Sequence, residues 1–325
     1  MRRRTLAAGL PAGLALAALP RGARAQADYP NRPIRMIVGF AAGGGTDLTA
    51  RSLQSKLQQA IGGSIVIDNR PGAGGNLATE LTVRAAPDGY TLLMGTIAAL
   101  AINPTLYRNL GFNPQTDLTP ISQSGSILNV LVVPADRPWR TLGDLIAAAR
   151  ARPDTITYGS SGVGGAGHLA GALLDRMAGV TTVHVPYRGG GPLMTDLVGA
   201  KIDYAFSTAP TAIPQIEAGK LRALAVPTPG RSALLPDVPA VAETLPGYEV
   251  GNWYALVGPR GLPRPIVDRL AAAMRTTLED PEVRRHLAAH GVEPTPSTPE
   301  ELGRFIRDET EKWAPIIRAT GATPD

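Results

Sequence analysis

Glycine-rich turns that also carry hydroxyl groups recur along this sequence, each directly after an apolar run. Glycine lets the backbone approach a ligand closely, and the free N–H groups at the start of a helix attract anions. A carboxylate held by such N–H groups and a few hydroxyls needs no cationic side chain. The turns that fit this chemistry are GFAAGGGTDL (39–48), NRPGAGGNLATE (69–80), MGTIAAL (94–100), YGSSGVGGAGHLAG (158–171), VPYRGGGPLMTDL (185–197) and FSTAPTAI (206–213).

Nucleotide-binding and nucleophile motifs do not fit these turns. A P-loop requires a lysine after its last glycine, and these turns contain none. A dinucleotide fingerprint on Gly43 and Gly45 requires a glycine at 48, where the chain has Leu48. A nucleophile elbow around Ser161 requires a glycine at 163, which is Val163. The turns therefore predict neither phosphate binding nor acyl transfer.

Candidates for catalysis or metal binding are few. The sequence has no cysteine and 4 histidines. His286 and His290 are close in sequence but lack the surrounding H-E-x-x-H pattern of zinc enzymes, so we interpret them as surface residues. His168 follows a glycine-rich turn and is either a ligand contact or a polar residue at a helix start. We expect no catalytic residue, metal or cofactor.

Several polar residues in the turns could have either a structural role or a role in ligand binding. Thr46 and Asp47 either cap a helix or contact a ligand, and a cap would also organise the N–H groups that a ligand uses. Asn76 has the same ambiguity. Arg188 either screens a second carboxylate or forms a surface salt bridge, whereas Arg70 is interpreted as structural. The hydroxyl donors that we expect near a ligand are Thr46, Thr96, Ser160, Ser161, Ser207 and Thr208.

The elements that must position these turns alternate between apolar β-prone runs and amphipathic helices. This rhythm predicts an α/β fold whose sheets are mainly parallel and flanked by helices. The alternation of strands and helices occurs twice along the chain, and the long β-prone runs 118–134 and 248–259 connect the two parts. We therefore expect two lobes with a cleft between them and two crossing strands. The first lobe would comprise residues 26–126 and 250–325, and the second residues 127–249.

The first 25 residues read as an export signal. They combine a basic start, an apolar Ala/Leu segment and an A-x-A site that predicts cleavage after Ala25. A membrane anchor is the alternative, but the apolar segment is short for a span. General secretion and the twin-arginine route both remain open. Removal of this segment leaves 27 of the 32 basic residues against 27 acidic ones, which argues against nucleic-acid binding.

The turns and the segments around them resemble the substrate-binding proteins of tripartite tricarboxylate transporters, the Bug family. The resemblance extends over essentially the whole chain after residue 25. It is carried by YPNRPIRMIVGFAAGGGTDLTAR (29–51), IDNRPGAGGNLATE (67–80), APDGYTLLMGT (86–96), AINPTLY (101–107), ITYGSSGVGGAGHLAG (156–171), VHVPYRGGGPLMTDLVGAKIDYAF (183–206), AGKLRALAV (218–226) and LPDVPAVAE (235–243).

The resemblance implies a two-lobed periplasmic binding fold, type II-like, that closes on one small organic acid. In the family, two loops of the first lobe hold one carboxylate, often through ordered waters. Mapped onto this chain, one of them runs from Phe40 to Asp47 and thus contains Phe40, Ala41, Ala42, Gly43, Gly44, Gly45, Thr46 and Asp47, and the other contains Gly95, Thr96 and Ile97. Ser160, Ser161 and Gly162 would face them from the second lobe, together with Ser207 and Thr208.

One departure from the family pattern bears on the ligand. Many relatives carry Asp-Asn after the D-x-x-F strand, where this chain has Ser207 and Thr208. Loss of the acidic group makes an amino acid a poorer candidate than a dicarboxylate, an aromatic acid or another small acid. We therefore predict a monomeric periplasmic protein that presents a small organic acid to a tripartite tricarboxylate-type permease. Delivery to a sensor kinase and an exported enzyme acting on a small acid are the alternatives.

Overall fold

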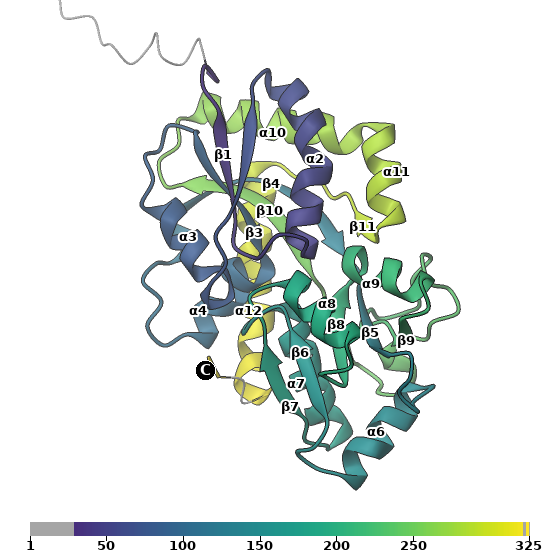
Figure 1. Cartoon of the computed structure of the whole chain (residues 1–325). Coiled ribbons are helices and arrows are strands. Elements are labelled where there is room, and N and C mark those ends of the chain that lie inside the picture. The colour runs from purple at the N-terminus through teal and green to yellow at the C-terminus, as the bar shows by residue number, and fades with distance from the viewer. Residues whose placement is uncertain (1–28, 321–322, 325) are drawn as a thin grey trace, which may run out of the picture.

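Two β-sheets, each flanked by helices, lie one above the other in the computed structural model (Figure 1). The structure describes residues 29–320 and 323–324. The predicted signal peptide and its cleavage site lie outside these residues. In residues 29–320 no helix is both long and apolar enough to span a membrane.

The first lobe is built on a six-stranded sheet with the order β11-β4-β10-β3-β1-β2. Its strands are β1 (Ile34–Val38), β2 (Ile65–Asn69), β3 (Thr91–Thr96), β4 (Leu118–Ile127), β10 (Trp253–Pro259) and β11 (Val292–Glu293). Its helical segments are α2 (Gly45–Ile61), η1 (Ala73–Gly75), α3 (Asn76–Val83), η2 (Ala98–Ile102), α4 (Asn103–Leu106), α5 (Pro114–Asp117), α10 (Arg264–Glu279) and α11 (Pro281–Ala289).

The second lobe is built on a five-stranded sheet with the order β7-β6-β8-β5-β9. Its strands are β5 (Asn129–Pro134), β6 (Thr157–Ser160), β7 (Val183–Pro186), β8 (Tyr204–Thr208) and β9 (Leu221–Ala225). Its helical segments are α6 (Leu142–Ala151), α7 (Ala166–Ala178), α8 (Gly190–Val198), α9 (Ala209–Glu217) and η3 (Val241–Glu243). The last helix of the chain is α12 (Pro299–Thr320).

The predicted two-lobed α/β fold is confirmed, but the sheets are mixed rather than mainly parallel. β1 pairs in parallel with β2 and β3, and β6 does so with β7 and β8. β10 is antiparallel to β3 and β4, and β5 is antiparallel to β8 and β9. The reason is the crossing itself: β4 leads out of the first lobe and β10 leads back into it, so the two must run in opposite directions.

The strands at the two crossings do not coincide with the β-prone runs of the sequence. β4 ends at Ile127 and β5 begins at Asn129, so Leu128 alone separates strands of different sheets. In the other run, the strand begins only at Trp253. The preceding Tyr248 is fully buried instead, and its hydroxyl donates to the carbonyl of Ala170 at 2.7 Å. Packing into the second lobe therefore keeps this segment out of the sheet.

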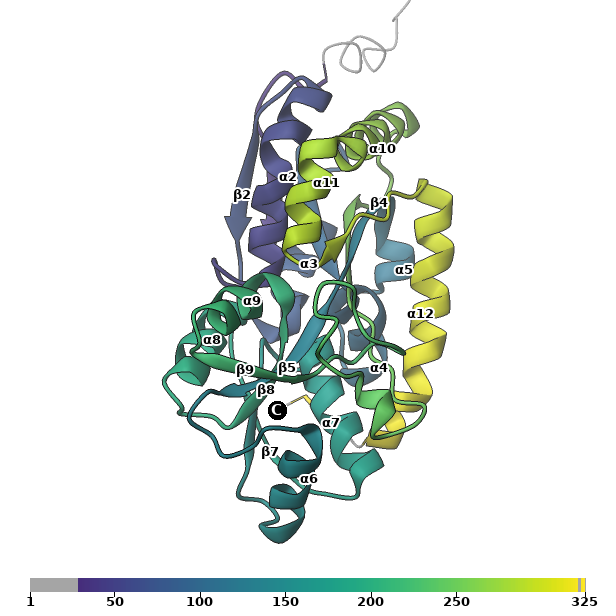
Figure 2. The same ribbon diagram turned by 90° about the vertical axis from the view of Figure 1, so that its right-hand side faces the viewer.

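Apolar contacts along α12 join the two lobes. α12 packs against β4 and η2 of the first lobe and α7 of the second, and it passes both sheets along one side of the molecule (Figure 2). The buried cluster around Trp313 includes Leu100 of the first lobe and Leu169 of the second. The Trp313 indole is fully buried, and its Nε1 donates to Glu309 at 3.2 Å.

Truncation of this indole tests how much the fold depends on α12. We predict that Trp313→Ala lowers the free energy of unfolding by about 3–5 kcal/mol, because it removes a large buried ring and leaves a cavity. Leu77→Ala is the control, since Leu77 is 45% exposed and should change stability by less than about 0.5 kcal/mol. Urea unfolding of both variants measures the difference. Equal effects of the two substitutions would contradict this role of α12.

Candidate functional site

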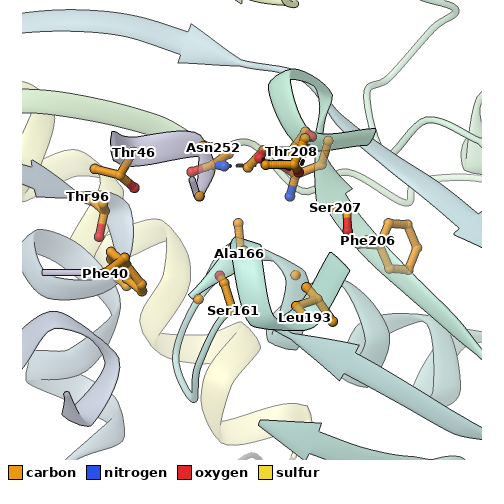
Figure 3. Close-up of a pocket in the computed structure, with 18 of the residues that line it drawn as sticks. Phe40, Thr46, Thr96, Ser161, Ala166, Leu193, Phe206, Ser207, Thr208 and Asn252 are labelled. Atoms are coloured by element: carbon orange, nitrogen blue, oxygen red, sulfur yellow. Dashed lines mark hydrogen bonds between the residues drawn. The ribbon is translucent and has the colours of Figure 1, made fainter. Parts of the chain in front are cut away.

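A small cavity lies between the lobes where the crossing strands meet the glycine-rich turns. Phe40, Thr46 and Thr96 lie on one side of it and Ser161 and Ser207 on the other (Figure 3). Its volume is about 40 Å³, which is room for a few water molecules. Pockets that hold small-molecule ligands have volumes of roughly 300–1,000 Å³. The lobes are therefore close together in this structure.

Helix starts from both lobes converge on this cavity. Gly45 at the start of α2 lines it from the first lobe, and Ala166 of α7, Gly190 of α8 and Thr208 before α9 line it from the second. The first N–H groups of a helix have no partner within the helix and carry a partial positive charge. Within the described chain, none of these helices has a side-chain cap.

Two helices that begin away from the cavity, α6 and α11, show the contrast, although α10 also begins away from it and has no side-chain cap among the described residues. Thr141 and Asp144 form a capping box at the start of α6, and Asp280 accepts from two N–H groups at the start of α11. Such caps satisfy the N–H groups that the cavity helices leave open. In addition, the described residues that line the cavity carry no charged side chain. The partial positive charges of the helix starts therefore favour an anion in the cavity without a cationic side chain.

Two buried hydroxyls are available to a ligand. The Thr96 side chain in the first lobe and the Ser207 side chain in the second are 5% and 3% exposed, and among the described residues neither hydroxyl has a hydrogen-bond partner. A buried polar group without a partner costs free energy, which a ligand that supplies the partner recovers. Burial raises the pKa of Tyr254, which also lines the cavity, to about 12, against the effect of hydrogen bonds with Thr46 and Asn252. Its hydroxyl is thus neutral and able to donate.

An asparagine pair forms the wall of the cavity at the crossing. Asn252 donates from Nδ2 to Oδ1 of Asn129 at 3.0 Å, and both line the cavity. The same two residues line a wide groove on the other side of the crossing segments. Sequence reasoning missed both asparagines, although their position within the two predicted crossings could have indicated them.

The structure brings part of the predicted site together. The predicted residues that line the cavity are Phe40, Gly44, Thr46, Thr96, Ile97, Ser161, Ser207 and Thr208. Those outside its lining are Ala41, Ala42, Gly43, Asp47, Asn76, Gly95, Ser160, Gly162 and His168. Gly162 lines a neighbouring hollow that shares Phe40 and Ser161 with the cavity and includes Arg188. Gly45, which lies within the predicted loop from Phe40 to Asp47, also lines the cavity. Residues of the lining that sequence reasoning missed are Ala98, Asn129, Gly165, Ala166, Gly167, Gly190, Leu193, Phe206, Thr211, Asn252 and Tyr254.

Asp47 organises the first turn rather than facing the cavity. Its carboxylate accepts from the N–H of Gly43 at 2.9 Å, from Arg51 and from Asn69. Burial alone would raise the pKa of Asp47, but these hydrogen bonds hold it below its ordinary value. Asp47 therefore remains charged, and Arg51 neutralises it within the same helix. The helix cap that we considered for Thr46 and Asp47 falls on Gly44 instead.

Asn76 and Asn103 brace the second glycine-rich turn. Nδ2 of Asn103 donates to Oδ1 of Asn76 at 2.6 Å and to the carbonyl of Gly74 at 3.2 Å. Both asparagines are buried. This contact fixes the η1 turn where it approaches the second lobe.

Ser160, His168 and His184 hold the 161–165 loop in place through hydrogen bonds and ring stacking. Ser160 Oγ lies 2.7 Å from Nε2 of His184 and donates to the carbonyl of Gly162 at 3.0 Å. His168 accepts from the N–H of Gly164 at 3.1 Å and stacks on His184 with ring centroids 4.1 Å apart. The Ser160 side chain is fully buried and outside the cavity lining. The pair is thus placed to hold the loop, not to attack a ligand.

His184 gives the second lobe a pH-dependent stability. Burial, and secondarily the charge of His168, lowers the pKa of His184 from 6.5 to about 3. Below pH 6.5 the unfolded chain therefore binds a proton that the folded chain does not, and stability falls by up to ~1.4 kcal/mol per pH unit. We predict that His184→Gln, whose amide can still reach Ser160, shows a smaller loss of stability between pH 6.5 and 4.5 than the unmodified protein.

Thermal unfolding at several pH values measures this difference. The control is His286→Gln, because His286 is exposed on α11. It should keep the slope of the unmodified protein. An unchanged slope for His184→Gln would show that His184 titrates normally in the folded chain.

Comparisons with known proteins agree with this geometry. Residues 49–322 match the model of the tripartite tricarboxylate transporter family receptor. The BugT protein of Bordetella pertussis is 36% identical over 90% of this chain and 91% of its own length. A protein encoded in the tcbD–tcbE intergenic region of Pseudomonas sp. strain P51 is 37% identical over 97% of this chain and 94% of its own.

Solved structures extend the similarity to the whole fold. The periplasmic binding protein BugD superposes with a TM-score of 0.88 at 34% identity, over 91% of this chain and all of that one. A Rhodopseudomonas palustris protein solved with adipate gives a TM-score of 0.89 at 35% identity over 92% of this chain and 100% of its own. MatC from the same organism, solved with malate, gives 0.85 at 31% identity over 89% of this chain and 100% of its own. The chain belongs to the receptor family of tripartite tricarboxylate transporters and is a relative of the Bug proteins.

Proposed function

We propose that this protein captures a small organic carboxylate between its lobes and presents it to a tripartite tricarboxylate-type membrane permease. One observation carries the proposal: uncapped helix starts from both lobes meet in a cavity whose described lining has no charged side chain. Such a site favours an anion and offers a cation no carboxylate partner. The unpartnered Thr96 and Ser207 hydroxyls supply further donors from opposite sides.

The relatives support a carboxylate rather than another anion. Adipate and malate occupy two of the similar solved proteins, and both are small dicarboxylates. In this chain, one carboxylate would meet the N–H groups at the start of α2 and the Thr96 hydroxyl. The rest of the molecule would extend toward α7 and Ser207. Charge-assisted hydrogen bonds of this kind are stronger than neutral ones.

Capture would proceed by closure about the two crossings. The cavity lies between the lobes, so the lobes must separate for a ligand to enter and must close again over it. We infer lobes of residues 26–126 with 250–325 and of 127–249, which turn about Leu128 and Asn252. Closure excludes water and strengthens each hydrogen bond to the ligand.

Location and partner follow from the same proposal. A cleaved leader ending at Ala25 would deliver the protein to the periplasm, where a closed, loaded form would be recognised by the permease. The family match supports this partnership. The ligand leaves unchanged in this scheme, because Ser160 and His184 lie outside the cavity lining.

A ligand screen tests the proposed function. The purified protein is melted alone and with di- and tricarboxylates, aromatic acids and amino acids, and isothermal titration measures the affinity of each hit. A ligand at 100 times its dissociation constant should stabilise the fold by about 2.7 kcal/mol. A small acid that binds and is recovered unchanged supports the proposal. Turnover of the ligand, or binding of cations alone, contradicts it. Mass spectrometry of the denatured protein identifies any ligand that co-purifies.

Removal of the two cavity hydroxyls should weaken binding without weakening the fold. We predict that Thr96→Val and Ser207→Ala each lower the affinity for the acid about 10- to 100-fold, the cost of one hydrogen bond to a charged group. Neither should lower the melting temperature of the free protein, because both hydroxyls are buried without a partner. Thr277→Val, a buried threonine of α10, is the control for affinity. Unchanged affinity in both cavity variants would place the ligand elsewhere.

A carboxylate built into the cavity should compete with the ligand. Thr208 packs against the start of α2, where a Cβ on Gly45 would lie 2.3 Å from the Thr208 hydroxyl. We predict that Thr208→Asp lowers the affinity for carboxylates at least about tenfold, because its own carboxylate uses the same helix dipole. Thr208→Asn has a similar size and no charge, and it should bind as the unmodified protein does within about threefold. Equal titration results for the two variants would refute the electrostatic argument.

A further inference from the structure

The glycine triplets of the two lobes lie against each other beside the cavity. Gly43–Gly45 leads into α2 in the first lobe, and Gly189–Gly191 leads into α8 in the second. The N–H of Ala41 donates to the carbonyl of Arg188 at 3.0 Å, which is a main-chain hydrogen bond between the lobes. Glycine-rich backbone therefore approaches glycine-rich backbone across the cleft.

This approach leaves no room for side chains. A Cβ on Gly191 would lie 2.8 Å from the carbonyl oxygen of Ala42, and one on Gly189 would lie 2.7 Å from the nitrogen of Ala41. A Cβ on Gly44 would lie 3.0 Å from the nitrogen of Gly190. Each of these contacts is with main-chain atoms, which cannot move aside as a flexible side chain can.

A second contact of the same kind flanks the cleft. A Cβ on Gly74 of the η1 turn would lie 2.3 Å from the carbonyl oxygen of Val163 in the second lobe. The Asn76–Asn103 contact braces this turn from within the first lobe. The lobes thus touch through main chain at two places.

We propose that Gly189–Gly191 are positioning residues that form the docking surface for the 41–45 turn when the lobes close. Absence of side chains lets the start of α8 come within reach of the start of α2, so both helix dipoles act on one ligand. This inference rests on the proposed function, since it specifies how the same site closes. Its consequence is that a methyl group at 191 acts on closure and not on the fold of either lobe.

Gly191→Ala separates these two effects. Gly191 is the second residue of α8 and precedes Pro192. The helix propensity that alanine gains there is offset by the crowding of its Cβ against the proline ring. The open form should therefore keep about its stability, while the closed form meets the clash with Ala42. We expect the affinity for the acid to fall about tenfold and the melting temperature of the free protein to change little.

Gly143→Ala is the matched control. Gly143 is also the second residue of a helix, α6 of the same lobe. Apart from its chain neighbours and the backbone of its own helix, the atom nearest to its Cβ position is Thr141 Oγ1, at 3.6 Å. This variant adds a methyl group at the same helix position without meeting the opposite lobe, and it should bind the acid as the unmodified protein does. Affinity that falls equally in both variants would overturn the proposal.

Spin labels on opposite lobes report closure directly. The sequence has no cysteine, so Gln59→Cys and Ala151→Cys, at exposed positions of α2 and α6, provide unique attachment sites. We expect Gly191→Ala to shift the distance distribution of the free protein to longer values. This readout requires no ligand, so it decides the inference even if no acid in the screen binds. An unchanged distribution would overturn it.

Discussion

Uncapped helix starts that point into an uncharged cavity are the constraint on which this structure depends. The free N–H groups of α2, α7 and α8 concentrate partial positive charge between the lobes. Side-chain caps would satisfy some of these groups and leave fewer donors for a ligand. The glycines that precede α2, α7 and α8 leave the donors open and also leave space for a ligand.

The same glycines also allow the main chains of the two lobes to come into contact beside the cavity. The 41–45 turn and the 188–191 turn come close enough for a hydrogen bond between Ala41 and Arg188. Each glycine triplet, Gly43–Gly45 and Gly189–Gly191, thus contributes both to the lining of the cavity and to the contact with the opposite lobe. Behind them, α12 packs on both lobes and Asn129 contacts Asn252 at the crossing, which restricts their relative motion to a turn about Leu128 and Asn252 in the scheme proposed above.

Sequence reasoning identified the two lobes and the turns, because hydrophobic rhythm and glycine spacing report local structure directly. It missed β10 and β4 as antiparallel partners, since strand direction depends on where a crossing leads and not on its composition. It also missed Asn129 and Asn252, which become cavity residues only when two distant crossings are brought side by side. Asp47 was ambiguous for a different reason. Its pattern fits a cap and a ligand contact equally, and only its hydrogen bonds to Gly43, Arg51 and Asn69 distinguish them.

In the proposed site, main-chain N–H groups hold the ligand's carboxylate. Proton–nitrogen NMR of glycine-labelled protein measures this directly, with the acid that binds in the screen and with its methyl ester. We expect the amide protons of Gly45 and Gly190 to move downfield with the acid and to stay in place with the ester. If these two amides do not respond to a bound acid, while side-chain signals elsewhere do, the ligand is held outside the helix starts, contrary to our proposal.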